Sequence, residues 1–259
     1  MYMYLDSHCH LNDPKLFPRV EEIIHSARDV DVKLFLVVGW DLASSKKAIE
    51  IAEKYPNVYA AVGIHPENIA EAGENDIKNL LKLAKHPKVK AIGEIGLDYH
   101  WFKAPEDREK QKKWFIEQID LANKLNLPIS IHARDASADT LDILRSHPLM
   151  SSGVLHCYSG SSENLLDFAK LGFYFGFDGP ITYKNAIEPK RNVQICPLER
   201  LLSETDSPYL APVPFRGHDN EPKNIPLIVK EMALIKEMPV EAVALQIEKN
   251  FRTLFRVKQ

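Results

Sequence analysis

The sequence predicts an α/β fold, a TIM-type (β/α)8 barrel, on three observations. Short apolar runs alternate with longer amphipathic segments from one end of the chain to the other, which is typical of parallel strands joined by right-handed helical crossovers. The chain has 259 residues, a length at which such barrels fold as one unit. No shift in composition marks a boundary, so residues 1–259 are expected to form a single domain. A doubly wound sheet is the alternative, although no Gly-x-Gly-x-x-Gly motif follows a strand.

Eight apolar runs are predicted to be the strands. Runs such as Leu-Phe-Leu-Val-Val show no alternation of polar and apolar residues, as expected when helices cover both faces of a parallel sheet. In chain order the predicted strands are Tyr4–His8, Lys33–Gly39, Val58–Ile64, Val89–Ile95, Pro128–His132, Gly153–His156, Phe173–Gly176 and Leu201–Asp206.

Apolar residues recur at helical spacing between these runs, most clearly in residues 111–125. The predicted helices include Ala43–Lys54, Asp76–Lys85, Glu106–Asn126, Ala138–Ser146 and Glu163–Leu171. The segment Val240–Arg256 is predicted to add an extra C-terminal helix on the outside of the barrel.

Composition excludes several classes of protein. The net charge of -3 argues against a protein that coats DNA nonspecifically, which needs a strongly basic face. The three cysteines are odd in number, which disfavours a disulfide framework. The N-terminus has no signal-peptide pattern and no apolar run is long enough to span a membrane. We therefore expect a cytoplasmic protein with no membrane contact. A monomer is expected because no long exposed apolar stripe stands out in the sequence.

Metal-binding residue types cluster where the predicted strands end, the edge at which barrels place their chemistry. His8 and His10 are two residues apart, and an extended chain points such residues to the same face. A single histidine at a strand end is more often structural. Five strands that all place ligand-type residues at the same end together predict a metal site. The other candidate residues are His65, Glu94, His132, His156 and Asp206.

Six motifs, taken in order, resemble the signatures of the TatD-type metal-dependent deoxyribonucleases, a branch of the amidohydrolase-like barrels. They are Asp-Ser-His-Cys-His, Gly-Ile-His-Pro, Gly-Glu-Ile-Gly-Leu-Asp-Tyr, Ile-His-Ala-Arg-Asp-Ala, His-Cys-Tyr-Ser-Gly and Glu-Thr-Asp-Ser-Pro. The resemblance runs from Leu5 to about Glu221. It implies a TIM-type barrel, a divalent metal centre and a deoxyribonuclease, 3′–5′ exonuclease-like, with DNA as its substrate.

Two divalent metals are expected, with Glu94 as the bridge where many barrel relatives use a modified lysine. One metal is assigned to His8, His10, Glu94 and Asp206, and the second to Glu94, His132 and His156. Imidazoles with carboxylates suit Zn, Mn, Fe or Ni, whereas Mg prefers oxygen ligands. The resemblance keeps Mg among the expected cofactors.

Roles in catalysis follow from these positions. Asp206 is the expected general base, Glu94 the bridge, and His65 either a donor to a phosphate oxygen or a structural hydrogen-bonding group. The residues predicted to contact substrate are Tyr158, Ser159, Arg134 and Arg216, although a solvated loop or a salt bridge would also explain the arginines. Cys9 and Cys157 are predicted to be buried wall residues rather than ligands.

Two other functions are compatible with the same residues. An activated water would serve equally in a hydrolase of another ester or amide, such as a D-aminoacyl-tRNA deacylase. A noncatalytic binding module is disfavoured because all six predicted ligand positions hold competent residues.

Overall fold

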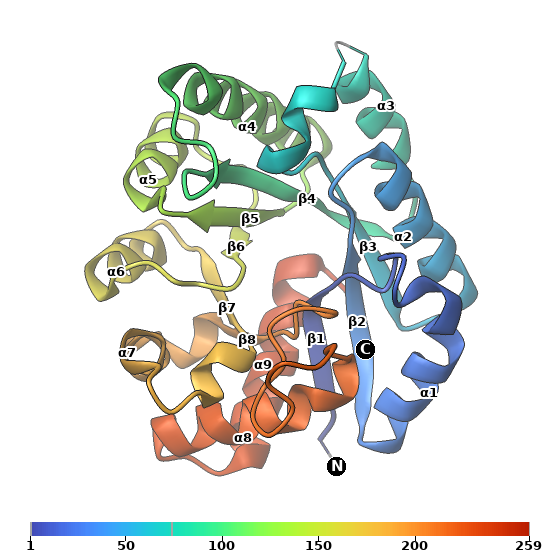
Figure 1. The fold of residues 1–259 in the computed structure, drawn as a ribbon, viewed down its shortest axis with the longest axis vertical. Helices are drawn as coiled ribbons and strands as arrows, with labels where there is room; N and C mark the ends of the chain where they lie inside the picture. The colour runs from blue at the N-terminus through green and yellow to red at the C-terminus, as the bar shows by residue number, and fades with distance from the viewer. Residues whose placement is uncertain (1, 74, 259) are drawn as a thin grey trace.

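The computed structural model describes residues 2–73 and 75–258 and confirms the predicted barrel. Its eight parallel strands follow one another around the sheet in chain order, with the helices outside them (Figure 1). The strands are β1 Tyr4–Cys9, β2 Val32–Val38, β3 Val58–Val62, β4 Val89–Asp98, β5 Ile129–Arg134, β6 Gly153–Leu155, β7 Tyr174–Phe177 and β8 Leu201–Ser203.

The predicted helices are present, with ends shifted by a few residues. Helix α2 begins at a capping box in which the Asp41 carboxylate accepts the Ser44 N–H, and α4 ends where Asn126 adopts a left-handed φ of 52°. The helices are α1 Val20–Asp29, α2 Leu42–Lys54, α3 Asp76–Leu83, α4 Pro105–Leu125, α5 Ser137–Ser146, α6 Ser162–Lys170, α7 Ile187–Ile195, α8 Ile225–Lys236 and α9 Val240–Phe255. Short 3-10 turns lie between several of these elements.

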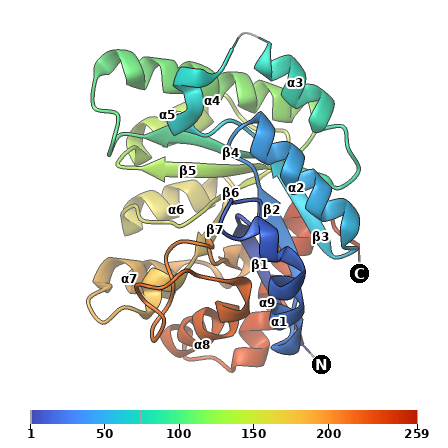
Figure 2. The ribbon, with the colours of Figure 1, turned by 45° about the vertical axis from the view of Figure 1, so that its right-hand side comes forward.

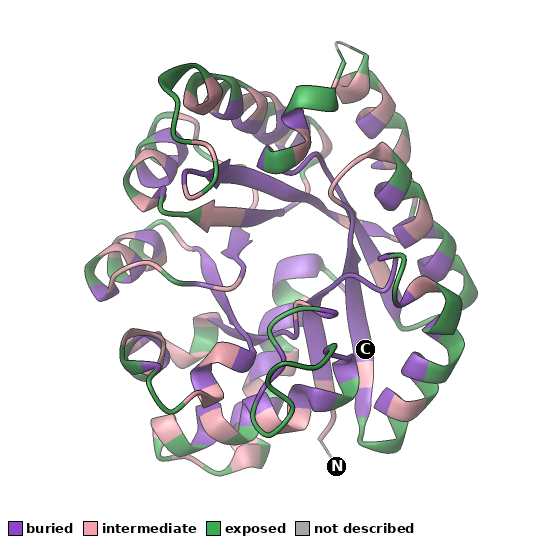
Figure 3. Cartoon of the chain, in the orientation of Figure 1, coloured by how far each residue is buried: buried purple, intermediate pink, exposed green. Residues whose placement is uncertain are grey.

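Burial follows the layers of the barrel. The strands are buried along almost their whole length, while the helices expose one face to solvent (Figure 3). Every residue of β2 except Lys33 is buried, which explains its continuous apolar sequence. The predicted C-terminal helix is α9, and it packs with α8 where β8 meets β1 (Figure 2). No helix in the described part of the chain has the length and apolar character needed to cross a membrane.

Two strands differ from their predicted limits in a way that bears on function. Strand β4 continues through Asp98, so Glu94 lies inside the strand rather than at its end. The pairing of β4 with β5 shifts between Ile92 and Ile95, where β4 has an additional residue, as in a β-bulge that re-aims a side chain. Strand β8 instead ends at Ser203, and Asp206 follows it in the loop.

Hydrogen bonds just beyond β8 close the barrel against β1. The Asp206 N–H donates to His8 O at 2.9 Å, and the His10 N–H donates to Ser207 O at 2.8 Å. Beneath them, the fully buried Asp6 carboxylate accepts the Thr205 N–H at 3.0 Å and the Thr205 hydroxyl at 2.6 Å. We call this junction of β1 with residues 203–207 the seam. It joins the first strand to the last.

The seam predicts a stability effect at Asp6. We expect Asp6→Ala to lower the free energy of unfolding by about 2–4 kcal/mol, because it leaves two buried donors of Thr205 without their acceptor. Asp6→Asn retains one acceptor oxygen and should lose less. Urea unfolding followed by circular dichroism measures both variants, with the exposed Asp142→Ala as control. A loss below about 1 kcal/mol would show that Asp6 does not hold the seam.

Candidate metal centre

A cavity of about 760 Å³ opens at the C-terminal ends of the strands, where barrel enzymes carry their active sites. Five of the predicted metal-binding residues line it directly. They are His10, Glu94, His132, His156 and Asp206. Aromatic and aliphatic side chains form much of the remaining wall, including Trp40, Tyr158, Phe177, Ile181 and Tyr209.

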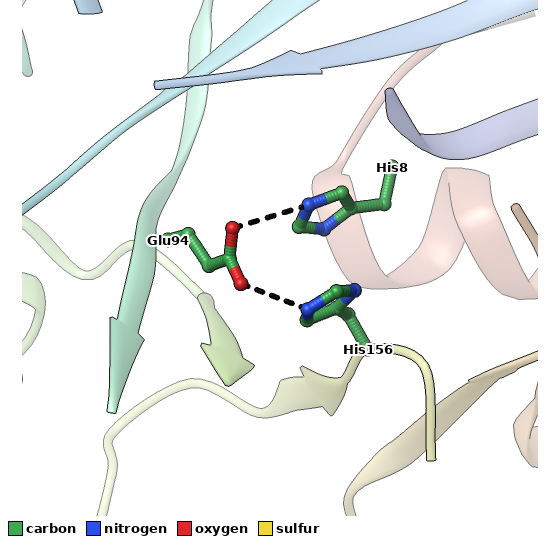
Figure 4. A group of neighbouring side chains, drawn as sticks. All are labelled: His8, Glu94 and His156. Carbon is green, nitrogen blue, oxygen red and sulfur yellow. Dashed lines mark ion pairs between the residues drawn. The ribbon is translucent and has the colours of Figure 1, made fainter. Parts of the chain in front are cut away.

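Glu94 lies at the centre of this group, and its two oxygens face different histidines. Oε2 is 3.4 Å from His8 Nε2 and 3.7 Å from His10 Nε2. Oε1 is 2.8 Å from His156 Nε2 and 3.0 Å from His132 Nδ1. Figure 4 shows His8 and His156 approaching the two oxygens separately. The carboxylate therefore stands between two sets of nitrogen donors.

Asp206 completes the set on the seam side. Its Oδ1 is 3.3 Å from His10 Nε2 and 3.7 Å from His8 Nε2. Its backbone has a left-handed φ of 54°, and its N–H is fixed to His8 O. The structure therefore brings together all six predicted ligands.

The donor set fits divalent metal ions. Among residues 2–73 and 75–258, three groups of side chains have ligand atoms within 4.8 Å of one another: His8, Glu94 and His156; His8, His10 and Asp206; and His65, Glu94 and His132. Nε2 of His8 and Nε2 of His10 are only 3.2 Å apart and approach the same two carboxylates. Buried imidazole and carboxylate ligands are those that Zn, Mn, Fe and Ni accept.

Groups behind the histidines fix which ring nitrogen faces the centre. His10 Nδ1 donates to Val38 O at 2.9 Å, which leaves Nε2 for a ligand. His132 Nε2 is held by Asp98 Oδ2 at 2.9 Å, so its Nδ1 faces Glu94. His156 Nδ1 lies 3.5 Å from the buried Glu204.

Sequence reasoning missed the roles of Asp98 and Glu204. A longer fourth strand would have revealed Asp98, because residues 94, 96 and 98 of a strand share a face. The sequence gives no comparable signal for Glu204, because the position of its side chain depends on how closely it approaches Gly176 in β7. A Cβ at Gly176 would lie 2.0 Å from Glu204 Oε2, so only glycine leaves room for this carboxylate.

Both central carboxylates remain negatively charged at neutral pH. Burial alone would raise the pKa of Glu94, but the neighbouring His156, His65 and His132 lower it well below its usual range. Burial likewise opposes ionisation of Asp206, and the hydrogen bond from His10 together with nearby imidazoles lowers its pKa. Two buried negative charges ringed by nitrogen ligands favour cation binding.

The predicted substrate residues are distributed unevenly around the cavity. His65, Arg134, Tyr158 and Ser159 all line it. His65 Nδ1 accepts the Glu67 N–H at 3.2 Å, and its Nε2 lies 3.4 Å from Glu94 Oε1. The Tyr158 hydroxyl donates to Ser161 O at 2.7 Å, so its proton is not available to a ligand.

Arg216 and the two predicted wall cysteines lie in different surroundings. The exposed Arg216 guanidinium lies 4.2 Å from the centre of the Tyr183 ring, outside the residues that line the cavity. Cys9 is buried, as predicted. Cys157 is half-buried and lines the cavity, where the left-handed backbone after His156 places it. Neither cysteine belongs to the ligand groups found in the described residues.

Comparison with known proteins identifies the family. A family model described as "TatD related DNase" matches residues 5–256. The chain is 43% identical over 256 residues to the "uncharacterized metal-dependent hydrolase YabD" of Bacillus subtilis, covering 98% of this chain and 100% of that protein. It is 38% identical to the "uncharacterized metal-dependent hydrolase YcfH" of Escherichia coli, covering 98% and 96% respectively.

Solved structures agree with the sequence comparisons. The crystal structure of YJJV, a TatD homologue from Escherichia coli, matches with a TM-score of 0.93 at 29% identity and covers 98% of both chains. A TatD-family hydrolase from Entamoeba histolytica matches with a TM-score of 0.87 at 25% identity, again covering 98% of both. The resemblance seen in the sequence motifs is thus confirmed, and the chain belongs to the TatD family, whose two bacterial members above are named metal-dependent hydrolases.

Proposed function

We propose that this metal-dependent hydrolase is a deoxyribonuclease that cleaves phosphodiester bonds with two divalent metals. The observation that carries the proposal is Glu94, whose two oxygens face separate sets of histidines. A carboxylate in that position can bridge two cations. The description of the matching family as TatD-related DNase supports DNA as the substrate.

The residues that would hold the metals divide along the two oxygens of Glu94. His8, His10 and Asp206 lie on the Oε2 side, and His132 and His156 lie on the Oε1 side. His65 also approaches Oε1 at 3.4 Å. Two bound divalent metals lower the pKa of a water and stabilise the charge of the phosphate in the transition state.

The protein's own groups would then position the substrate and transfer the proton. Asp206 accepts the proton of the attacking water, because its ionised carboxylate faces the cavity. Arg134 binds a phosphate oxygen from the rim. His65 donates through Nε2 to a second phosphate oxygen, since its Nδ1 is occupied as an acceptor. The recessed cavity admits the end of a strand more readily than the middle of a duplex, which favours exonuclease action, in the 3′–5′ direction that the family resemblance implies.

A substrate panel tests the proposal. Purified protein is stripped with a chelator and reloaded with Mn, Zn, Ni or Mg, and is then given single-stranded DNA blocked at the 3′ or the 5′ end, an aminoacyl-tRNA ester and a small amide. We expect metal-dependent release of nucleotides from the unblocked 3′ end. Hydrolysis of the ester or amide in preference to DNA would overturn the proposal and favour the deacylase.

Removing the bridge should empty both metal positions. We expect Glu94→Ala to retain less than about one tenth of the wild-type metal, because Glu94 is the one residue assigned to both metals. Metal content per chain by plasma mass spectrometry measures this directly, with the exposed Glu241→Ala as a matched control. Two metals per chain in Glu94→Ala would refute the bridging assignment.

Asp206→Asn separates proton transfer from metal binding. The amide retains an oxygen toward His10 but cannot accept a proton, so turnover should fall by about 10²–10⁴. Metal content should fall only modestly. The measurement is kcat on single-stranded DNA together with metal content for the same preparation. Near-normal turnover with both metals bound would show that Asp206 is not the general base.

A further inference from the structure

We propose that Trp101 and Arg134 form a stacking platform that holds the base next to the reacting phosphate of a single-stranded nucleic acid. The inference rests on the proposed function and extends it to a substrate site at the rim of the cavity. Such a platform would make the enzyme bind single strands more tightly than duplexes.

Trp101 is the exposed aromatic residue that suggests this site. Its side chain lies in the loop between β4 and α4, and the residue is 63% exposed. The Arg134 guanidinium lies 5.5 Å from the centre of the indole ring, within cation–π distance. Arg134 also lines the cavity. The Arg134 guanidinium therefore lies at the cavity rim, and the Trp101 ring extends the platform outward from it.

The platform is held at a fixed position relative to the metal centre. Asp98 Oδ1 accepts the backbone N–H groups of His100 at 2.9 Å and Trp101 at 3.0 Å. Its other oxygen, Oδ2, is 2.9 Å from His132 Nε2. Strands β4 and β5 pair Asp98 with Arg134 at their ends. One buried carboxylate thus joins the Trp101 loop to a predicted metal ligand.

The charges around the platform suit a nucleotide. Asp135, an acidic neighbour, forms a hydrogen bond with His100 Nδ1 at 3.1 Å. Arg134 forms no ion pair with a carboxylate of the described residues and can therefore bind a phosphate. An indole stacks on any unpaired base, and a base inside a duplex is not available to it. Since the chain carries a net charge of -3, stacking rather than broad electrostatic attraction would supply much of the affinity.

Binding of a strand that resists hydrolysis tests the platform. The probe is a fluorescein-labelled phosphorothioate (dT)10, single-stranded or paired with (dA)10, added to the metal-loaded protein and followed by anisotropy. We expect Trp101→Ala to weaken single-strand binding by roughly 5- to 100-fold. Trp101→Phe should restore most of the affinity, because it retains an aromatic face. Leu234→Ala, at a residue 72% exposed on α8, is the matched control and should bind as the wild type does.

A second readout separates stacking from a disturbance of the metal centre. Bis(p-nitrophenyl) phosphate carries no nucleobase that could stack on Trp101. Trp101→Ala should therefore lower kcat/KM for single-stranded DNA more than kcat/KM for this small ester. An equal loss on both substrates would overturn the platform, because the effect would then pass through Asp98 to His132.

Three other results would also refute the proposal. They are unchanged single-strand affinity in Trp101→Ala, equal affinity of the wild type for single and double strands, and a wild-type dimer that becomes monomeric in Trp101→Ala. The last result would assign the exposed indole to a second copy of the chain. Because the binding assay needs no turnover, a wild type that binds through Trp101 without cleaving DNA would contradict the proposed nuclease and leave the platform standing.

Discussion

The placement of one buried carboxylate determines most of what this barrel can do. Glu94 is almost fully buried, and an ionised group in such a position is costly unless opposite charges or donors surround it. His65, His132 and His156, which lie in or just after β3, β5 and β6, lower its pKa well below the usual range, and His8 of β1 lies 3.4 Å from its other oxygen. The shift of register in β4 brings Glu94 to this position from inside a strand. The same buried carboxylate and the imidazole nitrogens around it form a group of side chains that can bind a cation.

The closure of the barrel and the arrangement of the ligands depend on the same hydrogen bonds. At the seam, the backbones of His8 and His10 bond to those of Asp206 and Ser207. These are the two histidines and the aspartate that share the Oε2 side of Glu94. The buried pair of Asp6 and Thr205 supports the junction from below. Residues almost two hundred positions apart in the chain thus become neighbours because the last strand meets the first.

The order of the strands and the gathering of the six candidate ligands at one place were predictable from the sequence, because parallel strands in a barrel bring their C-terminal ends to one edge. The finer arrangement was not. The surroundings of Glu94 could not be predicted without knowing how β4 pairs with β5. Because the predicted strand ended at Ile95, it did not include Asp98. Glu204 reaches His156 only because Gly176 leaves space on another strand. Such contacts depend on tertiary approach, which local sequence patterns do not encode.

The carboxylates behind the histidines connect the candidate metal centre to the rim of the cavity. Asp98 uses one oxygen to orient His132 and the other to hold the backbone of the Trp101 loop. Glu204 likewise lies beside His156 and accepts the N–H of Cys157, a residue of the cavity wall. Asp98 therefore fixes an imidazole and a loop of the cavity rim at once, whereas Glu204 holds the backbone of Cys157 and lies 3.5 Å from His156 Nδ1 without a hydrogen bond to it. Because a charge-assisted hydrogen bond is stronger than a neutral one, Asp98 holds the backbone of the Trp101 loop at a fixed position relative to His132.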